Sequence, residues 1–347
     1  MLLGRTRGSA DVVAPASARP GGGARTRLDA RTRAFAPAAT GRYRVDVEGR
    51  TFEIDGTVRA RGEDGVLAVV AHVALERYVE GTVGREMPAS WEPEALRAQA
   101  IVSRTFALRA LREPADPDWD LEATTASQVF GGAAGVTDSV REAVRATRGE
   151  YLAFDGAPIL AYFHSASGGR TAASEEVWGR PVAYLPSVAV PDEDEAPSTY
   201  WRAAVARTTL RRALEGLGLD VGRIEGVRVA ERWPSGRVKR VVVRGEGGER
   251  NLSGPLWREA LGPNVVKSTL FELRDRGDDI VLVGSGHGHG VGMSQWGAKG
   301  MAARGASHRE ILATFYPGAT LEAARADSRE PAGAHASLPP VASGGER

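Results

Sequence analysis

The sequence predicts an α+β fold: a single mixed-sheet domain with helices, an α/β insertion and disordered termini. Two stretches, 43–47 and 51–54, alternate apolar with polar residues as half-buried strands do. Two others, 75–83 and 93–112, repeat apolar residues at helical spacing. Because these patterns do not follow a strand-helix-strand rhythm, a mixed sheet with attached helices is favoured over a parallel α/β fold.

Each further element follows from a local pattern. The apolar run 66–73 continues the first two strands as a meander. Ser307 followed by Glu310 is a capping box and predicts the start of the last helix. The other expected elements are a helix near 139–147, strands at 151–154 and 159–164, an insertion at about 200–262 with helices near 208–216 and 253–262 and strands near 225–232 and 238–244, strands at 269–273 and 280–283, and a helix at 293–304.

The two ends of the chain are poor in large apolar side chains. Residues 1–40 and 322–347 consist mainly of small, polar and charged residues with Pro and Gly. Such segments cannot offset the entropy lost on ordering. We therefore expect a disordered basic arm at 1–40, one continuous domain at 41–321 and a disordered tail at 322–347.

Composition excludes several classes of protein. The chain has 347 residues, 42% hydrophobic and 26% charged, as in soluble globular proteins. It has no cysteine, which excludes disulfides, thiolate nucleophiles and zinc sites that need sulfur. The net charge is only +1, and no basic domain for binding nucleic acid is evident. No run approaches the roughly 18 apolar residues of a membrane span.

The helix expected at 93–112 carries an arginine on an apolar face. Arg104 lies in one row with Ile101 and Leu108, and Gln99 lies in the neighbouring row. Buried charges are rarely left unpaired, so Arg104 is expected to meet a carboxylate or a bound anion. A purely structural ion pair or a snorkelling side chain is the alternative interpretation.

Glu86 lies just before that helix, in an apolar setting between Val83 and Met87-Pro88. A carboxyl group in an apolar pocket has a raised pKa and can act as a general acid. A helix cap or an ion-pair partner is the alternative role for this glutamate.

Two later segments, 162–171 and 284–295, combine polar side chains with glycines. Their polar candidates are His164, Ser165 and Ser167 in the first segment and His287, His289 and Gln295 in the second. A Ser nucleophile is disfavoured because the G-x-S-x-G elbow is absent. The three histidines could ligate a metal, but no acidic cluster accompanies them, so no metal site is predicted.

Several motifs in one order closely resemble the stage II sporulation protein D (SpoIID) family, which includes the amidase-enhancer (LytB) proteins. The resemblance covers roughly residues 70–321. The motifs are Leu75-Glu-Arg-Tyr-Val-Glu-Gly81, Arg85-Glu-Met-Pro88, Glu94 to Leu108, Ser127-Gln-Val-Phe130, Phe163-His-Ser-Ala-Ser-Gly-Gly169, Glu176-Val-Trp178 and Gly288-His-Gly-Val-Gly-Met-Ser-Gln-Trp-Gly297.

This resemblance implies a peptidoglycan lytic transglycosylase. Such an enzyme cleaves the bond between N-acetylmuramic acid and N-acetylglucosamine, preferably in strands stripped of stem peptides, and leaves 1,6-anhydro ends. Glu86 matches the glutamate of the family's E-M-P motif and would act as acid and then base. Arg104 matches the family's helix arginine and would hold the geometry of the site or the muramic lactyl carboxylate. The residues expected to line the glycan groove are Gln99, Gln128, His164, Ser165, Ser167, His289 and Gln295.

The resemblance also implies partners and a location. Glycan strands and a cell-wall amidase are the expected partners, with no cofactor, nucleic acid or membrane span. An extracytoplasmic location, in the periplasm or cell wall, is expected. The first residues lack the apolar core of about 7–15 residues that a secretory signal needs. A misplaced start or a truncated chain is our preferred explanation.

Departures from the family pattern leave alternatives open. Phe106 and Phe130 stand where the family often has tyrosine, and His287 stands where it has tryptophan. The protein could instead be a non-catalytic glycan-binding enhancer of an amidase. It could also be a hydrolase that pairs Glu86 with Glu175 or Glu176. The transglycosylase hypothesis predicts that Arg104 is buried beside Glu86.

Overall fold

The computed structural model describes residues 1–14, 25–36, 40–114, 116–123 and 128–323. Helices and strands both occur, and the strands form several sheets, which confirms the α+β class. Where the sequence predicts a single domain, the chain divides into two compact units. We call residues 1–161 with 320–323 the N-terminal unit, and residues 162–319 the C-terminal unit.

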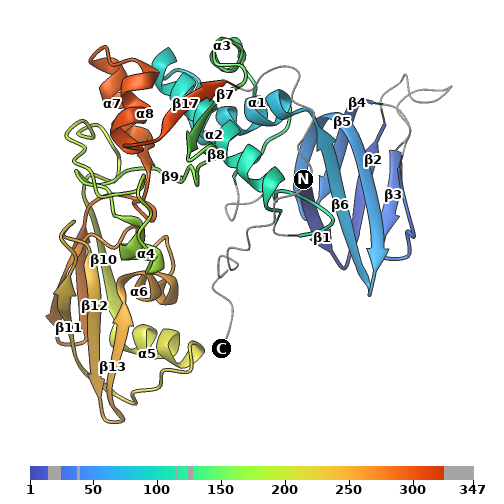
Figure 1. The fold of residues 1–347 in the computed structure, drawn as a ribbon. Helices are drawn as coiled ribbons and strands as arrows, with labels where there is room; N and C mark the ends of the chain where they lie inside the picture. The colour runs from blue at the N-terminus through green and yellow to red at the C-terminus, as the bar shows by residue number, and fades with distance from the viewer. Residues whose placement is uncertain (15–24, 37–39, 115, 124–127, 324–347) are drawn as a thin grey trace. The chain divides into compact units, whose positions relative to one another are not determined.

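The N-terminal unit contains a six-stranded antiparallel sheet, drawn in blue in Figure 1. Its strands are β1 (Leu2–Thr6), β2 (Ser9–Val13), β3 (Arg25–Asp29), β4 (Gly41–Val47), β5 (Arg50–Glu63) and β6 (Val66–Val73), in the order β1-β6-β5-β4-β2-β3. Alternate side chains such as Val45, Ile54 and Val69 are fully buried. After β3, Phe35 forms a bridge with Ala60 of β5, so the sheet curls back on itself.

Three strands form in the described part of residues 1–40, where the sequence analysis expects a disordered arm. β1, β2 and β3 form there, and their few apolar side chains, among them Leu3, Val12 and Leu28, are buried. β1 pairs with β6 and β2 pairs with β4, so strands richer in β-branched residues supply the partners. Residues 15–24 and 37–39 lie outside the described residues.

Helices and a small sheet complete the N-terminal unit. They are α1 (Leu75–Glu86), α2 (Pro93–Arg112), α3 (Asp138–Ala146), β7 (Glu150–Phe154), β8 (Ala157–Pro158) and β17 (Thr320–Ala323). α2 packs against α1, α3 and β7, which explains why most of its residues are buried. β17 pairs with β7, so residues 322–323 of the expected tail are in a strand, and residues 324–347 lie outside the described residues.

The C-terminal unit contains two three-stranded antiparallel sheets. One sheet is β10 (Trp201–Ala206), β15 (Asp279–Gly284) and β14 (Phe271–Arg276), and the other is β11 (Ile224–Arg232), β12 (Val238–Gly245) and β13 (Gly248–Ser253). With α5 (Arg207–Gly216) and α6 (Gly254–Leu261) they enclose one core that includes Leu210, Val241, Trp257 and Leu282. The elements expected in the 200–262 insertion therefore share a core with the two strands that follow them.

The remaining elements of the C-terminal unit carry the glycine-containing motifs. β9 (Phe163–His164) pairs in parallel with β16 (Met293–Ser294), and α4 (Ser174–Trp178) follows β9. The predicted strand at 159–164 is therefore reduced to two residues. α7 (Gln295–Ala303) and α8 (His308–Phe315) pack together, and the predicted capping box of Ser307 and Glu310 is confirmed.

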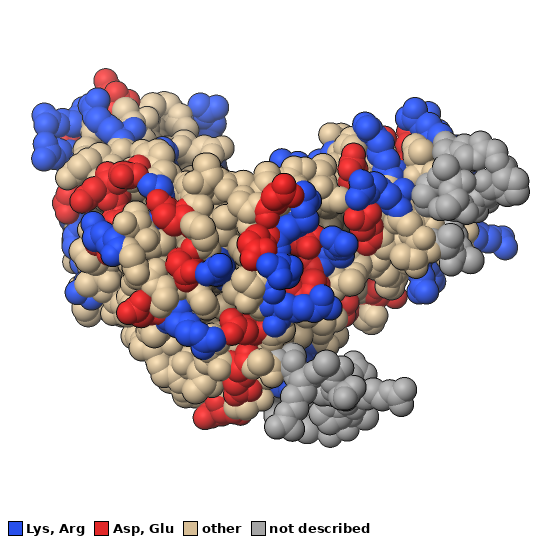
Figure 2. Space-filling view, turned by 90° about the horizontal axis from the view of Figure 1, so that it is seen from above, with Lys and Arg blue, Asp and Glu red and all other residues tan. Residues whose placement is uncertain are grey.

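Figure 2 shows acidic and basic side chains scattered over one face of the molecule, among uncharged residues that occupy much of it. None of the helices in the described ranges is both long and apolar enough to cross a membrane.

Candidate functional site

Glu86 is the last residue of α1, and a loop of residues 128–132 holds its carboxylate. The side chain is half-buried, and the backbone N–H of Val129 donates to its Oε1 at 2.8 Å. The loop approaches α1 closely because Gly81 has no side chain: a Cβ there would lie 2.6 Å from the ring of Phe130. One oxygen of the predicted acid is thus fixed by backbone.

Tyr78 and Gln128 support this loop. The Tyr78 hydroxyl donates to Oε1 of Gln128 at 2.8 Å, and its ring stacks on Phe130 with centroids 5.6 Å apart. Burial raises the pKa of Tyr78, so the hydroxyl stays protonated and remains a donor. Gln128 is only 1% exposed, and its Nε2 is buried without a hydrogen-bond acceptor among the described residues. In this structure Gln128 supports the loop that holds Glu86 rather than presenting a surface to a sugar.

Arg104 is fully buried, as predicted, but its carboxylate partner is Glu76 of α1. Nε and Nη2 donate to the two oxygens of Glu76 at 2.9 and 2.7 Å. Nη1 donates to the carbonyl oxygen of Glu150 at 3.0 Å, and Nη2 also lies 3.4 Å from that of Val144. Arg104 is thus paired with Glu76, where the sequence analysis expects it beside Glu86. The guanidinium instead joins α2 to α1, α3 and β7, and no part of it is open to a lactyl carboxylate.

Gln99 is also fully buried within the N-terminal unit. Its Nε2 donates to the hydroxyl of Ser103, one turn along α2, at 3.1 Å. Because no surface of Gln99 is exposed, it contributes to helix packing here and does not line an open groove.

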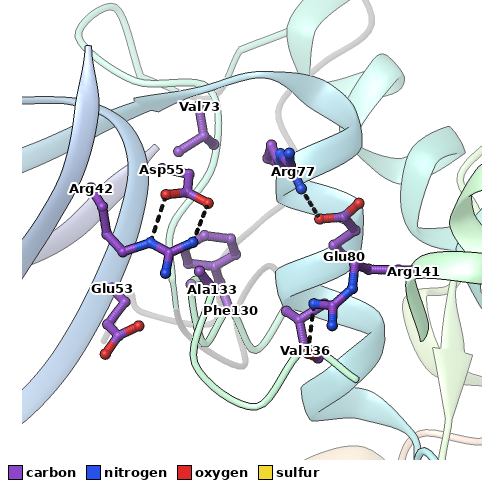
Figure 3. A pocket seen from close by; sticks show the side chains of 11 residues that line it. Arg42, Glu53, Asp55, Val73, Arg77, Glu80, Phe130, Ala133, Val136 and Arg141 are labelled. Atoms are coloured by element: carbon purple, nitrogen blue, oxygen red, sulfur yellow. Dashed lines mark hydrogen bonds and ion pairs between the residues drawn. The ribbon is translucent and has the colours of Figure 1, made fainter. Parts of the chain in front are cut away.

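A small pocket of about 60 Å³ lies between the sheet and α1 in the same unit (Figure 3). Arg42 of β4 makes two hydrogen bonds with Asp55 of β5, and Arg77 bonds to Glu80 along α1. The guanidinium of Arg141 donates a hydrogen bond to the carbonyl oxygen of Val136. These charges neutralise one another, and Glu86 is not among the lining residues, so the pocket is best explained as part of the packing between sheet and helix.

In the C-terminal unit, the side chains of His164 and His289 are both hydrogen-bonded to the backbone of Val291. Nδ1 of His164 donates to the carbonyl oxygen of Val291 at 3.1 Å, and Nδ1 of His289 accepts from the N–H of Val291 at 3.0 Å. Since a carbonyl can only accept, the proton of neutral His164 is on Nδ1, which leaves Nε2 as an acceptor. That Nε2 is buried and has no donor among the described residues. The two rings lie 5.7 Å apart.

Aromatic rings surround this histidine pair. Trp178, at the end of α4, stacks obliquely on Tyr162 with centroids 4.4 Å apart, and His289 lies 5.5 Å from Trp178. Trp178 is 37% exposed, so this cluster reaches the surface of the unit. Burial lowers the pKa of His289 to about 4 and that of His164 well below its ordinary range. Both rings are therefore neutral near pH 7.

These neutral histidines predict a loss of stability in acid. The unfolded chain takes up a proton at each histidine near pH 6.5, whereas folded His289 resists protonation until about pH 4. Stability should therefore fall as the pH drops from about 6.5 to about 4, with His289 contributing on the order of 3 kcal/mol. Urea unfolding of the wild type and His289→Gln across this range measures the effect. A shallower pH dependence in the variant is expected; identical slopes would contradict it.

Glu193 holds the loop at residues 167–169 in place, and the sequence analysis did not identify it. Its carboxylate accepts from the N–H groups of Ser167, Gly168 and Gly169 at 2.7, 2.8 and 3.0 Å and from the Ser167 hydroxyl at 2.7 Å. The hydroxyl of Ser294 also donates to it. Ser167 is fully buried and bound in this way, so it anchors the loop and does not offer a free hydroxyl to a ligand. The signal available in the sequence was the run of N–H donors at Ser167-Gly168-Gly169.

Other predicted residues of this unit lie near the same loops. Ser165 is half-buried, and its carbonyl accepts from the N–H of Trp296. Gln295 is the first residue of α7 and is 7% exposed. His287 forms a backbone bridge with Ala166.

Arg237 and Glu176 are two further polar residues that are buried in the C-terminal unit. Nη2 of Arg237 donates to the carbonyl oxygens of Ser167 and Arg170 at 2.8 and 3.2 Å, and burial lowers the pKa of Arg237 to about 10. Burial raises the pKa of Glu176, which accepts from Ser235. Within the described ranges, no three His, Asp or Glu side chains gather closely enough to hold a metal ion.

Comparison with known proteins agrees with the resemblance. The family model of the stage II sporulation protein (SpoIID) matches residues 63–154, which contain Glu86 and Arg104. A second model, for a domain of unknown function (DUF8618), matches residues 191–292.

Three relatives align over most of this chain. Stage II sporulation protein D of Bacillus subtilis is 34% identical over 276 residues, covering 74% of this chain and 77% of the relative. An uncharacterized protein of Brachyspira hyodysenteriae is 32% identical, covering 73% and 67%. The amidase enhancer of Bacillus subtilis is 30% identical, covering 70% of this chain and 40% of that protein. On its motifs, its fold class and these relatives, the chain belongs to the SpoIID family.

Proposed function

We propose that the protein is a lytic transglycosylase that cleaves peptidoglycan glycan strands at the bond from N-acetylmuramic acid to N-acetylglucosamine. The observation that carries the proposal is the placement of Glu86. It is a half-buried carboxylate at a helix end, with one oxygen held by a backbone N–H at 2.8 Å. It also falls in the segment that matches the SpoIID family model.

A single carboxyl group is sufficient for this reaction. Protonated Glu86 would donate its proton to the glycosidic oxygen as the bond from C1 of the muramic acid breaks. The resulting carboxylate would then take the proton of the C6 hydroxyl of the same sugar as that oxygen bonds to C1. The product carries a 1,6-anhydro ring, no water is consumed, and Glu86 is returned to its protonated state.

The other predicted residues would contribute in two ways. Arg104 is a positioning residue, because it fixes α1 through Glu76 and has no exposed atom with which to touch substrate. Exposed and half-buried side chains are the better candidates for glycan contacts, and His289, with its neighbour Trp178, is the clearest of these in the C-terminal unit. An extracytoplasmic location in the periplasm or cell wall follows from such a substrate.

The second candidate function is a non-catalytic enhancer of a cell-wall amidase. It is favoured by the similarity to a protein named amidase enhancer, which this chain matches over 40% of that protein's length. An enhancer would keep a glycan-binding surface and an amidase partner, but it would need no acid at position 86.

A cleavage assay with the chain alone separates the two functions. Glycan strands stripped of stem peptides are incubated with the purified protein in EDTA, and the products are separated by chromatography. We expect shorter strands to accumulate, with no loss of activity in EDTA. Strands that stay intact until an amidase is supplied would favour the enhancer, and activity that is lost in EDTA and restored by zinc would contradict the metal-free mechanism.

A further inference from the structure

Arg85, which precedes Glu86 in the last turn of α1, is an exposed arginine that has no carboxylate partner in the part of the chain that the structure describes. The other arginine of α1, Arg77, is paired with Glu80 at 2.8 Å, and the neighbouring Arg104 and Arg42 are paired with Glu76 and Asp55. Among the described residues, no hydrogen bond or ion pair reaches the guanidinium of Arg85. Its charge is therefore available to a ligand.

The stem of Arg85 is nevertheless held in place by the loop that binds Glu86. A Cβ at position 131 would lie 2.4 Å from Nε and 2.7 Å from Cγ of Arg85, so the side chain lies flat against Gly131. Holding the stem reduces the rotamer entropy that a free arginine loses when it binds an anion.

The same loop places the cation near the proposed acid. Val129 bonds to the carboxylate of Glu86, and Gly131 packs on Arg85. Two residues of extended chain span at most about 7 Å, so both side chains lie along one short edge of the loop. A group bound at Arg85 would therefore belong to the sugar at Glu86 or to its immediate neighbour.

We propose that Arg85 binds the free lactyl carboxylate of N-acetylmuramic acid and so favours strands without stem peptides. This inference rests on the proposed glycan substrate. The lactyl group is attached to C3 of the sugar whose C1 carries the scissile bond. In stripped strands it ends in a carboxylate, whereas a stem peptide converts it to an amide. Arginine binds carboxylates through charge-assisted hydrogen bonds that a neutral amide lacks.

The test measures binding, so that it does not depend on catalysis. Stripped strands with free carboxylates, and the same strands after carbodiimide conversion of those carboxylates to amides, are titrated into the Glu86→Gln protein, which leaves them intact. The Kd for amide strands is divided by the Kd for carboxylate strands, and this ratio is compared between the Glu86→Gln protein and the Glu86→Gln/Arg85→Gln protein. Arg112→Gln in the same background is the control, because Arg112 is an exposed arginine in the last turn of α2. It lies about 28 Å along the helix from Pro93, the first residue of α2 and the end that follows Glu86 in the chain.

We expect carboxylate strands to bind about tenfold more tightly than amide strands, as a charge-assisted hydrogen bond implies. Arg85→Gln should bring the ratio close to one, and Arg112→Gln should leave it unchanged. Gly131→Ala should reduce the ratio too, because it displaces the arginine without removing its charge. The ratio should also shrink at high ionic strength.

An equal ratio in the Arg85→Gln protein and its parent, or a parent that does not distinguish the two strands, overturns the inference. Cleavage by the wild type is measured separately. If the wild type does not cleave strands but its preference depends on Arg85, the proposed enzyme fails while the carboxylate contact stands for a glycan-binding enhancer.

Discussion

Glu86→Gln is expected to lower the rate of glycan cleavage by about 10²–10⁴-fold, the usual contribution of a general acid and base. The amide has the shape of the carboxyl group but cannot donate or take up the proton. Its oxygen can still accept the hydrogen bond from the N–H of Val129, so the fold and glycan binding should be unchanged. Cleavage rate, thermal melting and strand affinity are the measurements.

Glu142→Gln is the matched control for Glu86→Gln. Glu142 is an exposed glutamate of α3 that is paired with Arg145, so its loss removes one negative charge without touching the loop at 128–132. We expect wild-type activity from this control. A Glu86→Gln protein with activity within tenfold of the wild type would show that the acid lies elsewhere.

Arg104→Ala is expected to have the largest effect on stability. It removes a fully buried guanidinium that bonds to both oxygens of Glu76 and to the carbonyl of Glu150. Breaking one side of such a buried pair typically costs about 3–5 kcal/mol. For a unit of this size the melting temperature should fall by roughly 10 °C. Activity should fall with it, because α1 carries both Glu76 and Glu86.

Two companion variants locate the cause of this loss. Arg104→Lys keeps the charge but loses the planar fork, so it should also lower the melting temperature, though by less than alanine. Glu76→Gln should destabilise the protein because it leaves the Arg104 charge buried without its counterion. A wild-type melting temperature for Arg104→Ala and Arg104→Lys would contradict the structural role described for this arginine.

The sequence pattern predicted Arg104's burial but not its partner. The helical row of apolar residues around position 104 shows that the side chain points into the core, which is a local property. Glu76 lies 28 positions earlier and on another helix, so only the packing of α1 on α2 brings the two together. The pattern left the partner open, and Glu86 was expected beside Arg104 because the family resemblance implies that both belong to the site, which does not fix a contact in three dimensions.

The same distinction applies to the fold. α1, α2 and the strands β4 to β6 follow from periodicity in long segments, where many residues agree. β1, β2 and β3 are five residues each and contribute few apolar side chains, so their formation depends on pairing with neighbours that the local sequence does not reveal.

Glu193 was missed for a related reason. It lies in the acidic run Asp192 to Glu195, which is typical of a solvated surface. Its side chain is nevertheless buried, and its carboxylate accepts hydrogen bonds from N–H groups of a loop that is distant in the sequence.

The mass of the cleavage products tests the central claim most directly. If Glu86 alone acts as acid and then base, each new muramic acid end carries an anhydro ring, and the two fragments together have the mass of the parent strand. A hydrolase that uses a second carboxylate such as Glu176 would add one water to each cleaved bond. Mass spectrometry of stripped strands digested by the wild-type protein is predicted to show anhydro ends. Fragments heavier by one water would contradict the transglycosylase mechanism.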